Sequence, residues 1–107
     1  MRSIGGGLEL DVLLAVAALD GAAYGLAVRD HVEQARGRES SVGAIYTTLA
    51  RLEAKGLLAG RVTEPLAVRG GRSRREYQLT GAARMALAAE RERSARRWGA
   101  EPQGGLS

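Results

Sequence analysis

The pattern of apolar positions predicts three helices in the first half of the chain. Residues 8–19 are apolar on nearly all sides, which is typical of a helix that is buried all round. Residues 24–36 alternate an apolar and a charged side at helical spacing, and residues 42–55 do the same after Ser41, a favourable N-cap. The expected buried positions of these two helices are Leu26, Val28, Val32, Ala35, Val42, Ile45, Leu49 and Leu52. Two such helices joined by a short turn form a helix-turn-helix motif.

The second half of the chain predicts a long hairpin and one more helix. Residues 58–63 and 75–79 are predicted to be strands, and the segment between them contains Pro and Gly residues typical of a hairpin tip. Thr80 is a favourable N-cap for a last helix over residues 82–97.

These elements define the expected fold class, which is mainly α with a small β-wing. A helix-turn-helix followed by a hairpin wing is a winged helix. We therefore expect one domain, with a winged helix-turn-helix over residues 8–80 and a dimerisation helix over residues 81–98. Residues 99–107 have the composition of a flexible tail.

The third predicted helix has an outer face unlike an ordinary solvated one. Its residues are small and neutral, so the helix could lie close to the bases of a DNA major groove. Hydroxyl groups and the helix N-terminus favour phosphate, whereas Thr and Arg side chains could also contact bases. A structural alternative is that Tyr46 is a half-buried packing residue and Thr47 plain surface. The candidate DNA-binding residues of this segment are Ser40, Ser41, Gly43, Ala44, Tyr46, Thr47 and Arg51.

The positive charge of the chain is concentrated in the predicted wing. Residues 61–75 contain five arginines and one glutamate, so this segment alone accounts for the net charge of +4. A local basic patch attracts polyanions and gives salt-dependent affinity, although an Arg-rich loop could also be merely solvated. The candidate DNA-binding residues of the wing are Arg69, Arg72, Arg74 and Arg75.

The first and last helices are predicted to join two copies of the chain. Residues 8–19 are too apolar for one small domain to bury, and a two-fold contact would cover them together with the last helix. Trp98 could close this contact or offer a flat platform to a planar small-molecule effector between subunits. The candidate dimer-interface residues are Leu8, Leu13, Val16, Leu87 and Trp98.

Composition argues against several other classes of protein. The chain has no cysteine and one histidine, His31, so the usual zinc ligands are nearly absent and we expect no metal or other cofactor. No Ser/His/Asp arrangement is present, and the glycines at 70–71 open no helix, so we expect no enzyme. No segment is long and apolar enough to span a membrane, and the first residues lack the pattern of a secretory signal. We therefore expect a cytoplasmic protein.

Four segments together resemble the PadR family of bacterial transcriptional regulators: LELDVLLAVAAL, AYGLAVRDHVE, SVGAIYTTLARLEAKGLL and GGRSRREYQLTGAARMAL. The resemblance implies a winged helix with a C-terminal dimerisation helix, and a homodimer that binds a two-fold operator, usually as a repressor. By position, Tyr46 matches the DNA-contacting tyrosine of the family and residues 70–72 match its wing tip. Thr47 stands where many members have proline. The chain resembles the short branch of the family, in which an effector would bind between subunits.

Two alternatives to a dimeric repressor remain at this point. The chain could be a winged-helix module that docks on a partner protein, although such a surface usually exposes larger apolar residues. It could also belong to another winged-helix regulator family, such as the MarR or ArsR type. Metal-sensing ArsR types need thiolates or several histidines, and this chain has neither.

Overall fold

The computed structural model describes residues 4–5, 7–63 and 74–98, and this part of the chain forms four helices and two strands. In chain order the elements are α1 (Gly7–Ala18), α2 (Gly25–Arg36), α3 (Val42–Ala54), β1 (Leu58–Val62), β2 (Arg75–Leu79) and α4 (Gly81–Arg97). All six elements were predicted from the sequence, and their ends differ from the prediction by at most one residue. The predicted flexible tail, residues 99–107, lies outside the described residues.

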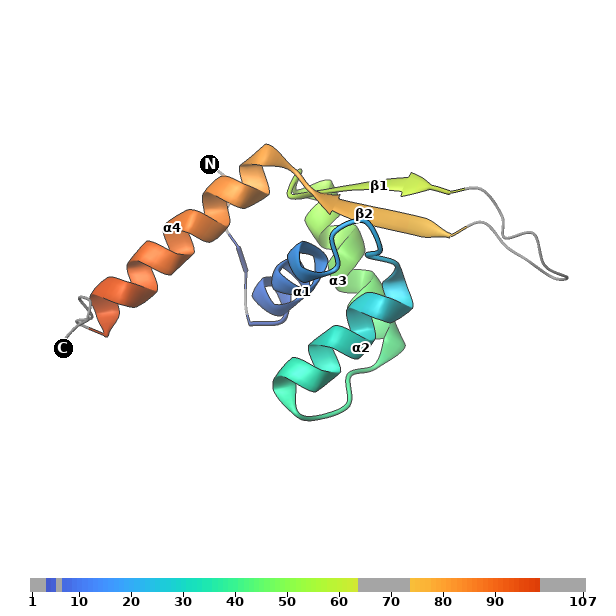
Figure 1. Cartoon of the computed structure of the whole chain (residues 1–107), viewed down its shortest axis with the longest axis horizontal. Coiled ribbons are helices and arrows are strands. Elements are labelled where there is room, and N and C mark those ends of the chain that lie inside the picture. The colour runs from blue at the N-terminus through green and yellow to red at the C-terminus, as the bar shows by residue number, and fades with distance from the viewer. Residues whose placement is uncertain (1–3, 6, 64–73, 99–107) are drawn as a thin grey trace, which may run out of the picture.

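Helices α1, α2 and α3 pack against one another and enclose most of the hydrophobic core (Figure 1). The strands and Leu57, the residue before β1, close the remaining side, because Leu57, Leu58 and Tyr77 are also buried in this core. The largest fully buried side chains are Leu13, Ile45, Leu49, Leu52, Leu57, Val12, Val28 and Val32.

Local hydrogen bonds fix where the helices begin and end. The Ser41 hydroxyl accepts the Ala44 N–H at 3.0 Å at the start of α3, and the Thr80 hydroxyl accepts the Ala83 N–H at 3.1 Å at the start of α4. Both N-caps were predicted. Gly56 follows α3 with φ of +79°, a left-handed conformation that glycine adopts without a Cβ clash, so the chain turns there into β1.

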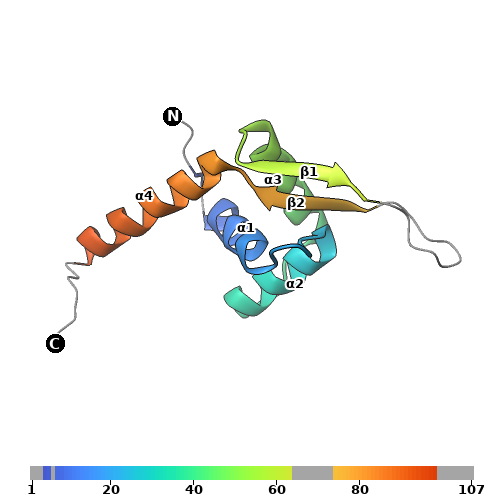
Figure 2. The same ribbon diagram turned by 45° about the horizontal axis from the view of Figure 1, so that its top comes forward.

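The hairpin of β1 and β2 is tied to the helical body at its base. The strands pair antiparallel, with Leu58 opposite Leu79. The Tyr77 N–H also donates to the Ala23 carbonyl at 3.0 Å, which joins β2 to the segment before α2. In Figures 1 and 2 the strands run out from the body on one side, and α4 leaves it on the opposite side.

The prediction that Leu13 and Val16 of α1 lie in a dimer contact was wrong. Both side chains are buried in the core of their own subunit and cannot form a surface. The other side of α1 is the exposed one, and Leu14 there is 49% accessible. An apolar helix of uniform composition hides this difference, because its hydrophobic pattern does not indicate which side faces the core.

The predicted apolar sides of α2 and α3 were partly wrong. Val28 and Val32 are fully buried, but Leu26 is 57% accessible and Ala35 is exposed. On α3, Val42 is also exposed at the first helical position. These positions lie at helix ends or at the edge of the apolar stripe, where the neighbouring elements no longer cover the side chain.

Candidate nucleic-acid interface

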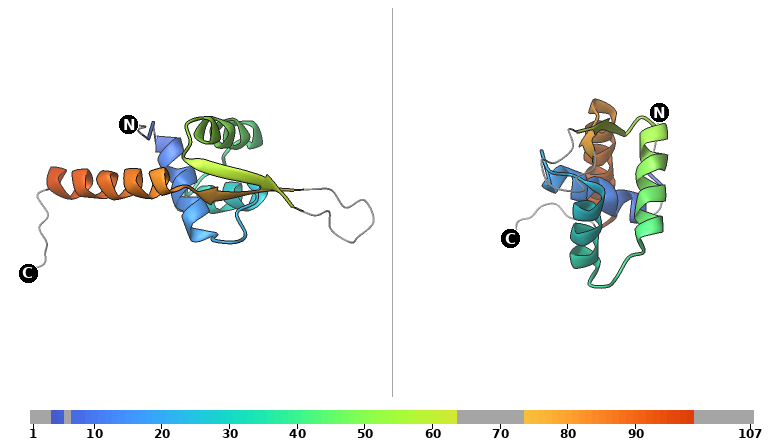
Figure 3. Two further views of the ribbon diagram at one scale, coloured as in Figure 1. Left: turned by 90° about the horizontal axis from the view of Figure 1, so that it is seen from above. Right: turned by 90° about the vertical axis from the view of Figure 1, so that its right-hand side faces the viewer.

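Helix α3 lies along the outside of the molecule (Figure 3, right). The residues on its exposed side are small. Gly43, Ala44, Thr47 and Ala50 are all exposed, as the sequence predicted. The opposite side is held in the core, and the hydroxyl of the neighbouring Thr48 is turned inward, donating to the Ala44 carbonyl at 2.7 Å. The exposed side therefore has no large side chain that would keep its backbone away from a flat or grooved partner.

The turn before α3 is tied to α2 by its backbone. The Ser40 N–H donates to the Glu33 carboxylate at 2.8 Å, and the Ser40 carbonyl accepts from Arg29 at 3.0 Å. Arg29 and Glu33 also form an ion pair at 3.3 Å. The start of α3, with the capping Ser41, is thus held at a fixed angle to α2, as a helix-turn-helix requires.

Tyr46 lies on the flank of α3 and packs against the start of α2. Its ring and hydroxyl group occupy the space that a Cβ at Gly25 would need, so only glycine fits there. The Tyr46 side chain remains 43% accessible. Tyr46 is thus a half-buried packing residue, which was the alternative to a DNA contact in the sequence analysis. It also keeps an accessible side at the edge of the exposed face of α3.

Arg51 extends the exposed face of α3 toward its C-terminal end. Its guanidinium lies 4.0 Å from the carboxylate of Glu9 on α1, and more than half of the side chain is accessible. Glu9 also accepts hydrogen bonds from Lys55 at 2.8 Å and from the Gly5 N–H at 2.6 Å. Burial raises the pKa of Glu9, but these hydrogen bonds and the two positive charges outweigh it and hold the pKa below its ordinary value of 4.5.

The Glu9 contacts give a prediction for stability. Because the pKa of Glu9 is lower in the folded chain, its contribution is fully present above about pH 4.5 and is lost as the pH falls through the folded pKa. Glu9→Gln should lower the free energy of unfolding at pH 7 by about 1–3 kcal/mol. The deficit should shrink in acid. Urea unfolding at pH 7 and pH 3 measures both effects, with Glu39→Gln, an exposed acid, as the control. An equal deficit at both pH values would contradict a role for the Glu9 charge.

The described arginines at the root of the wing are engaged by neighbouring side chains. Arg61 pairs with the buried Glu76 at 3.2 Å, and Arg74 stacks on the ring of Tyr24 at 4.2 Å from its centroid. Arg75 forms an ion pair with Glu53 of α3. The predicted contacts Arg69 and Arg72 lie outside the described residues. The basic excess of the wing root is therefore smaller than sequence counting suggests, since two arginines there are paired with acids outside the 61–75 segment.

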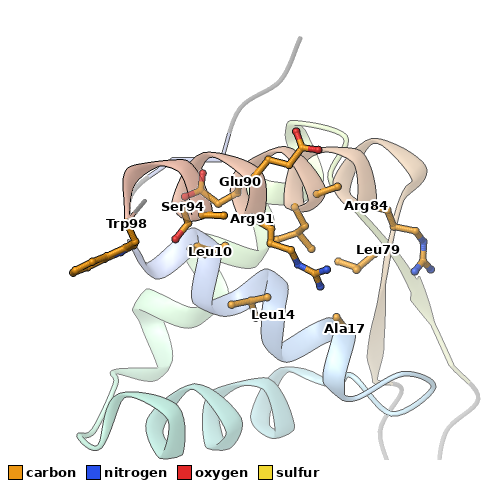
Figure 4. Close-up of a pocket in the computed structure, with 13 residues that line it drawn as sticks. Leu10, Leu14, Ala17, Leu79, Arg84, Glu90, Arg91, Ser94 and Trp98 are labelled. Carbon is orange, nitrogen blue, oxygen red and sulfur yellow. The ribbon is translucent and has the colours of Figure 1, made fainter. Parts of the chain in front are cut away.

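A second surface lies between α1 and α4, on the side away from the wing. Figure 4 shows Leu10, Leu14 and Ala17 along α1 below α4, with Arg91 reaching toward them and Trp98 at the far end. These residues line an open groove of about 1010 Å³. Its lining consists of Leu10, Leu14, Ala17, Leu79, Arg84, Leu87, Ala88, Glu90, Arg91, Glu92, Ser94, Ala95 and Trp98.

Helix α4 has little contact with its own subunit. Of its residues only Ala83 is buried, and Trp98 is 81% accessible just after its end. Of the predicted interface residues, Leu87 and Trp98 line the groove, whereas Leu8 packs at the edge of the core. Sequence analysis missed Leu10, Leu14 and Ala17, although their spacing along one helix face could have revealed them.

The described residues include no group of His, Cys, Asp and Glu side chains that could hold a metal ion. None of the helices found in these residues is both long enough and apolar enough to cross a membrane.

A helix-turn-helix followed by a two-stranded wing defines a winged-helix protein. The chain belongs to the transcriptional regulator PadR-like family, whose model matches residues 13–89. The resemblance inferred from the sequence is thereby confirmed, and the chain is a transcription regulator by family.

Solved structures of similar proteins support this assignment. RosR from H. salinarum is 26% identical, with a TM-score of 0.72 over 92% of this chain and 81% of that one. A PadR family transcriptional regulator from Eggerthella lenta is 26% identical, with a TM-score of 0.61 over 86% and 82%. A PadR-like transcription factor from Bacteroides fragilis is 25% identical, with a TM-score of 0.60 over 84% and 82%. The comparison with curated proteins found no match.

Proposed function

We propose that this chain is a homodimeric repressor that binds a two-fold DNA operator through α3 and the wing. The observation that carries the proposal is the exposed face of α3, on which Gly43, Ala44, Thr47 and Ala50 present small neutral side chains. A helix with such a face can approach base edges in a major groove closely. Tyr46 and Arg51, at the edges of this face, would contact phosphates or bases.

The proposed dimer contact is compatible with the proposed DNA contact. A second copy seated in the groove between α1 and α4 would cover Leu14 and Trp98, which one subunit leaves accessible. A two-fold axis there would leave α3 and the wing of each copy free on the outside. Two recognition helices about 34 Å apart could then enter successive major grooves on one side of the DNA. A small-molecule effector would bind in the same groove between the subunits.

A mobility-shift assay tests the proposed function directly. The probe is the DNA upstream of the gene for this chain, because regulators of this kind are expected to control their own region, and the competitor is unrelated DNA of equal length. The proposal predicts a retarded complex that survives the competitor and weakens as salt is raised. A protein-docking module would give no complex that resists the competitor.

The wing should contribute affinity for any DNA sequence. Arg74 is exposed at the wing root, and its stacking on Tyr24 leaves the guanidinium charge in place. Arg74→Ala should weaken binding to operator and unrelated DNA alike and reduce the salt slope by about one unit, as the loss of one phosphate contact would. Anisotropy titrations at several salt concentrations measure this slope. A loss confined to the operator would instead make Arg74 a base contact.

A further inference from the structure

The ion pair between α3 and the wing involves a residue that sequence analysis assigned to DNA. Arg75 is the first residue of β2, and its guanidinium reaches Glu53 near the end of α3. The Arg75 Nε also lies 3.4 Å from the other carboxylate oxygen of Glu53, so the contact uses both oxygens. The contact therefore joins the two elements that the proposed function assigns to DNA, and these lie side by side in Figures 2 and 3.

The backbone of β1 is shaped to let this contact form. Arg75 crosses β1 at Gly60, where an added Cβ would lie 2.7 Å from the Arg75 Nε and 3.1 Å from a Glu53 oxygen. Gly60 and Arg75 share one face of the hairpin, because Gly60 pairs with Tyr77, two residues along from Arg75. A side chain at position 60 would therefore occupy the space through which Arg75 reaches α3.

The electrostatics of the contact favour the charged state of both partners. The hydrogen bond from Arg75 lowers the pKa of Glu53, partial burial opposes this, and the Arg75 charge and the Gly60 N–H lower it further, leaving it below its ordinary value. The same hydrogen bond raises the pKa of Arg75. Both groups are thus charged at neutral pH, and Arg75 is engaged before any DNA arrives.

We propose that Glu53, Gly60 and Arg75 form a clamp that fixes the wing at its working angle to α3, so that Arg75 is a positioning residue and not a DNA contact. This inference rests on the proposed DNA-binding function. A wing root held to α3 keeps the wing and the recognition helix at one relative placement. Both elements can then contact the DNA backbone at once. Fixing the hairpin strands relative to α3 at the moment of binding would cost free energy and reduce affinity, and the clamp avoids that cost.

Whether Glu53→Gln strengthens or weakens DNA binding distinguishes a clamp from a direct DNA contact. Glu53→Gln removes a negative charge near the DNA surface, so it should strengthen binding if Glu53 is only a surface acid or merely competes for Arg75. The clamp predicts the opposite, a roughly three- to tenfold weaker complex and a smaller salt slope, because wing contacts to phosphate are lost. Glu39→Gln, an exposed acid in the turn before α3, is the matched control and should not weaken binding.

Two further variants make the test independent of charge. Gly60→Ala alters no charge but should displace Arg75 from Glu53 and weaken binding like Glu53→Gln, whereas Gly81→Ala, with open space around the added Cβ, should bind normally. Arg75→Gln combined with Glu53→Gln should cost no more than either change alone, since both remove one contact. Additive losses, or tighter binding by Glu53→Gln, would overturn the clamp.

Amide hydrogen exchange without DNA distinguishes failure of the clamp from failure of the proposed function. In Glu53→Gln and Gly60→Ala, the Thr63 N–H, which donates to the Arg74 carbonyl at 2.7 Å beyond the clamp, should exchange faster than in the native chain. Unchanged exchange there would refute the clamp even if DNA is bound. Faster exchange in the two variants, together with a native protein that binds no DNA, would refute the proposed function and, with it, the role of the clamp in binding.

Discussion

Leu14→Asp should convert the protein from a dimer to a monomer at low micromolar concentration and weaken operator binding by more than about 100-fold. Leu14 is half accessible in the single subunit, so the charge should not unfold the chain. In the proposed dimer the same side chain is covered by the second copy, and an unpaired charge buried in an apolar contact costs several kcal/mol. A monomer then contacts one half-site of the operator only. In the dimer the second subunit adds affinity without a separate association step, because it is already joined to the first.

Sedimentation equilibrium measures the effect on association, and circular dichroism confirms that the helices persist. Leu26→Asp is the matched control, because Leu26 is slightly more exposed than Leu14 but lies on α2, away from the groove. It should remain dimeric. Leu87→Asp should also dissociate the dimer, but Leu87 packs against the core as well, so it tests the interface less cleanly. A Leu14→Asp protein that stays dimeric would contradict the proposed interface.

Thr47→Glu should abolish specific binding, with a loss of at least about 100-fold on the operator. Thr47 is exposed on the small face of α3, so the change leaves the core intact but sets a carboxylate and added bulk where bases and phosphates would lie. Ala82→Glu, at an exposed position of α4 outside the groove lining, adds the same group elsewhere and is the control for net charge. Anisotropy titration of both variants on one operator measures the difference. Equal affinities for the two variants would remove α3 from the binding surface.

Arg51→Ala tests whether Arg51, on the same helix, contacts a base or a phosphate. If Arg51 reads a base, Arg51→Ala should lower the binding free energy on the preferred site by about 1–3 kcal/mol. The loss should be smaller on operators in which that one base pair is changed. Because Arg51 also lies near Glu9, its partner in the free protein, a urea melt must show that stability is unchanged. A uniform loss on every DNA would make Arg51 a phosphate contact.

The order of helices and strands was predictable from the sequence because local signals agree. Ser41 and Thr80 supply N-caps, Gly56 allows the left-handed turn after α3, and the apolar stripe of α3 has a clear helical period. The inner side of α1 was not predictable in this way. Leu13 and Leu14 are adjacent and equally apolar, and only the packing of α2 and α3 determines which of them is buried.

The ion pairs of the candidate interface were also beyond sequence reasoning. Glu53 and Arg75 are distant in sequence, and their meeting depends on the angle between α3 and the hairpin. Counting charges therefore overstated the free positive charge of the wing. The small exposed face of α3, by contrast, was predicted correctly, because a regular helix fixes which positions lie opposite its buried stripe.

Hydroxyl-radical footprinting on the DNA upstream of the gene tests the central claim most directly. The account predicts two protected patches related by a two-fold axis and spaced about one helical turn apart, on one side of the DNA. Thr47→Glu should erase both patches together. A single patch without symmetry, or protection that survives Thr47→Glu, would contradict a dimer that reads its operator through α3.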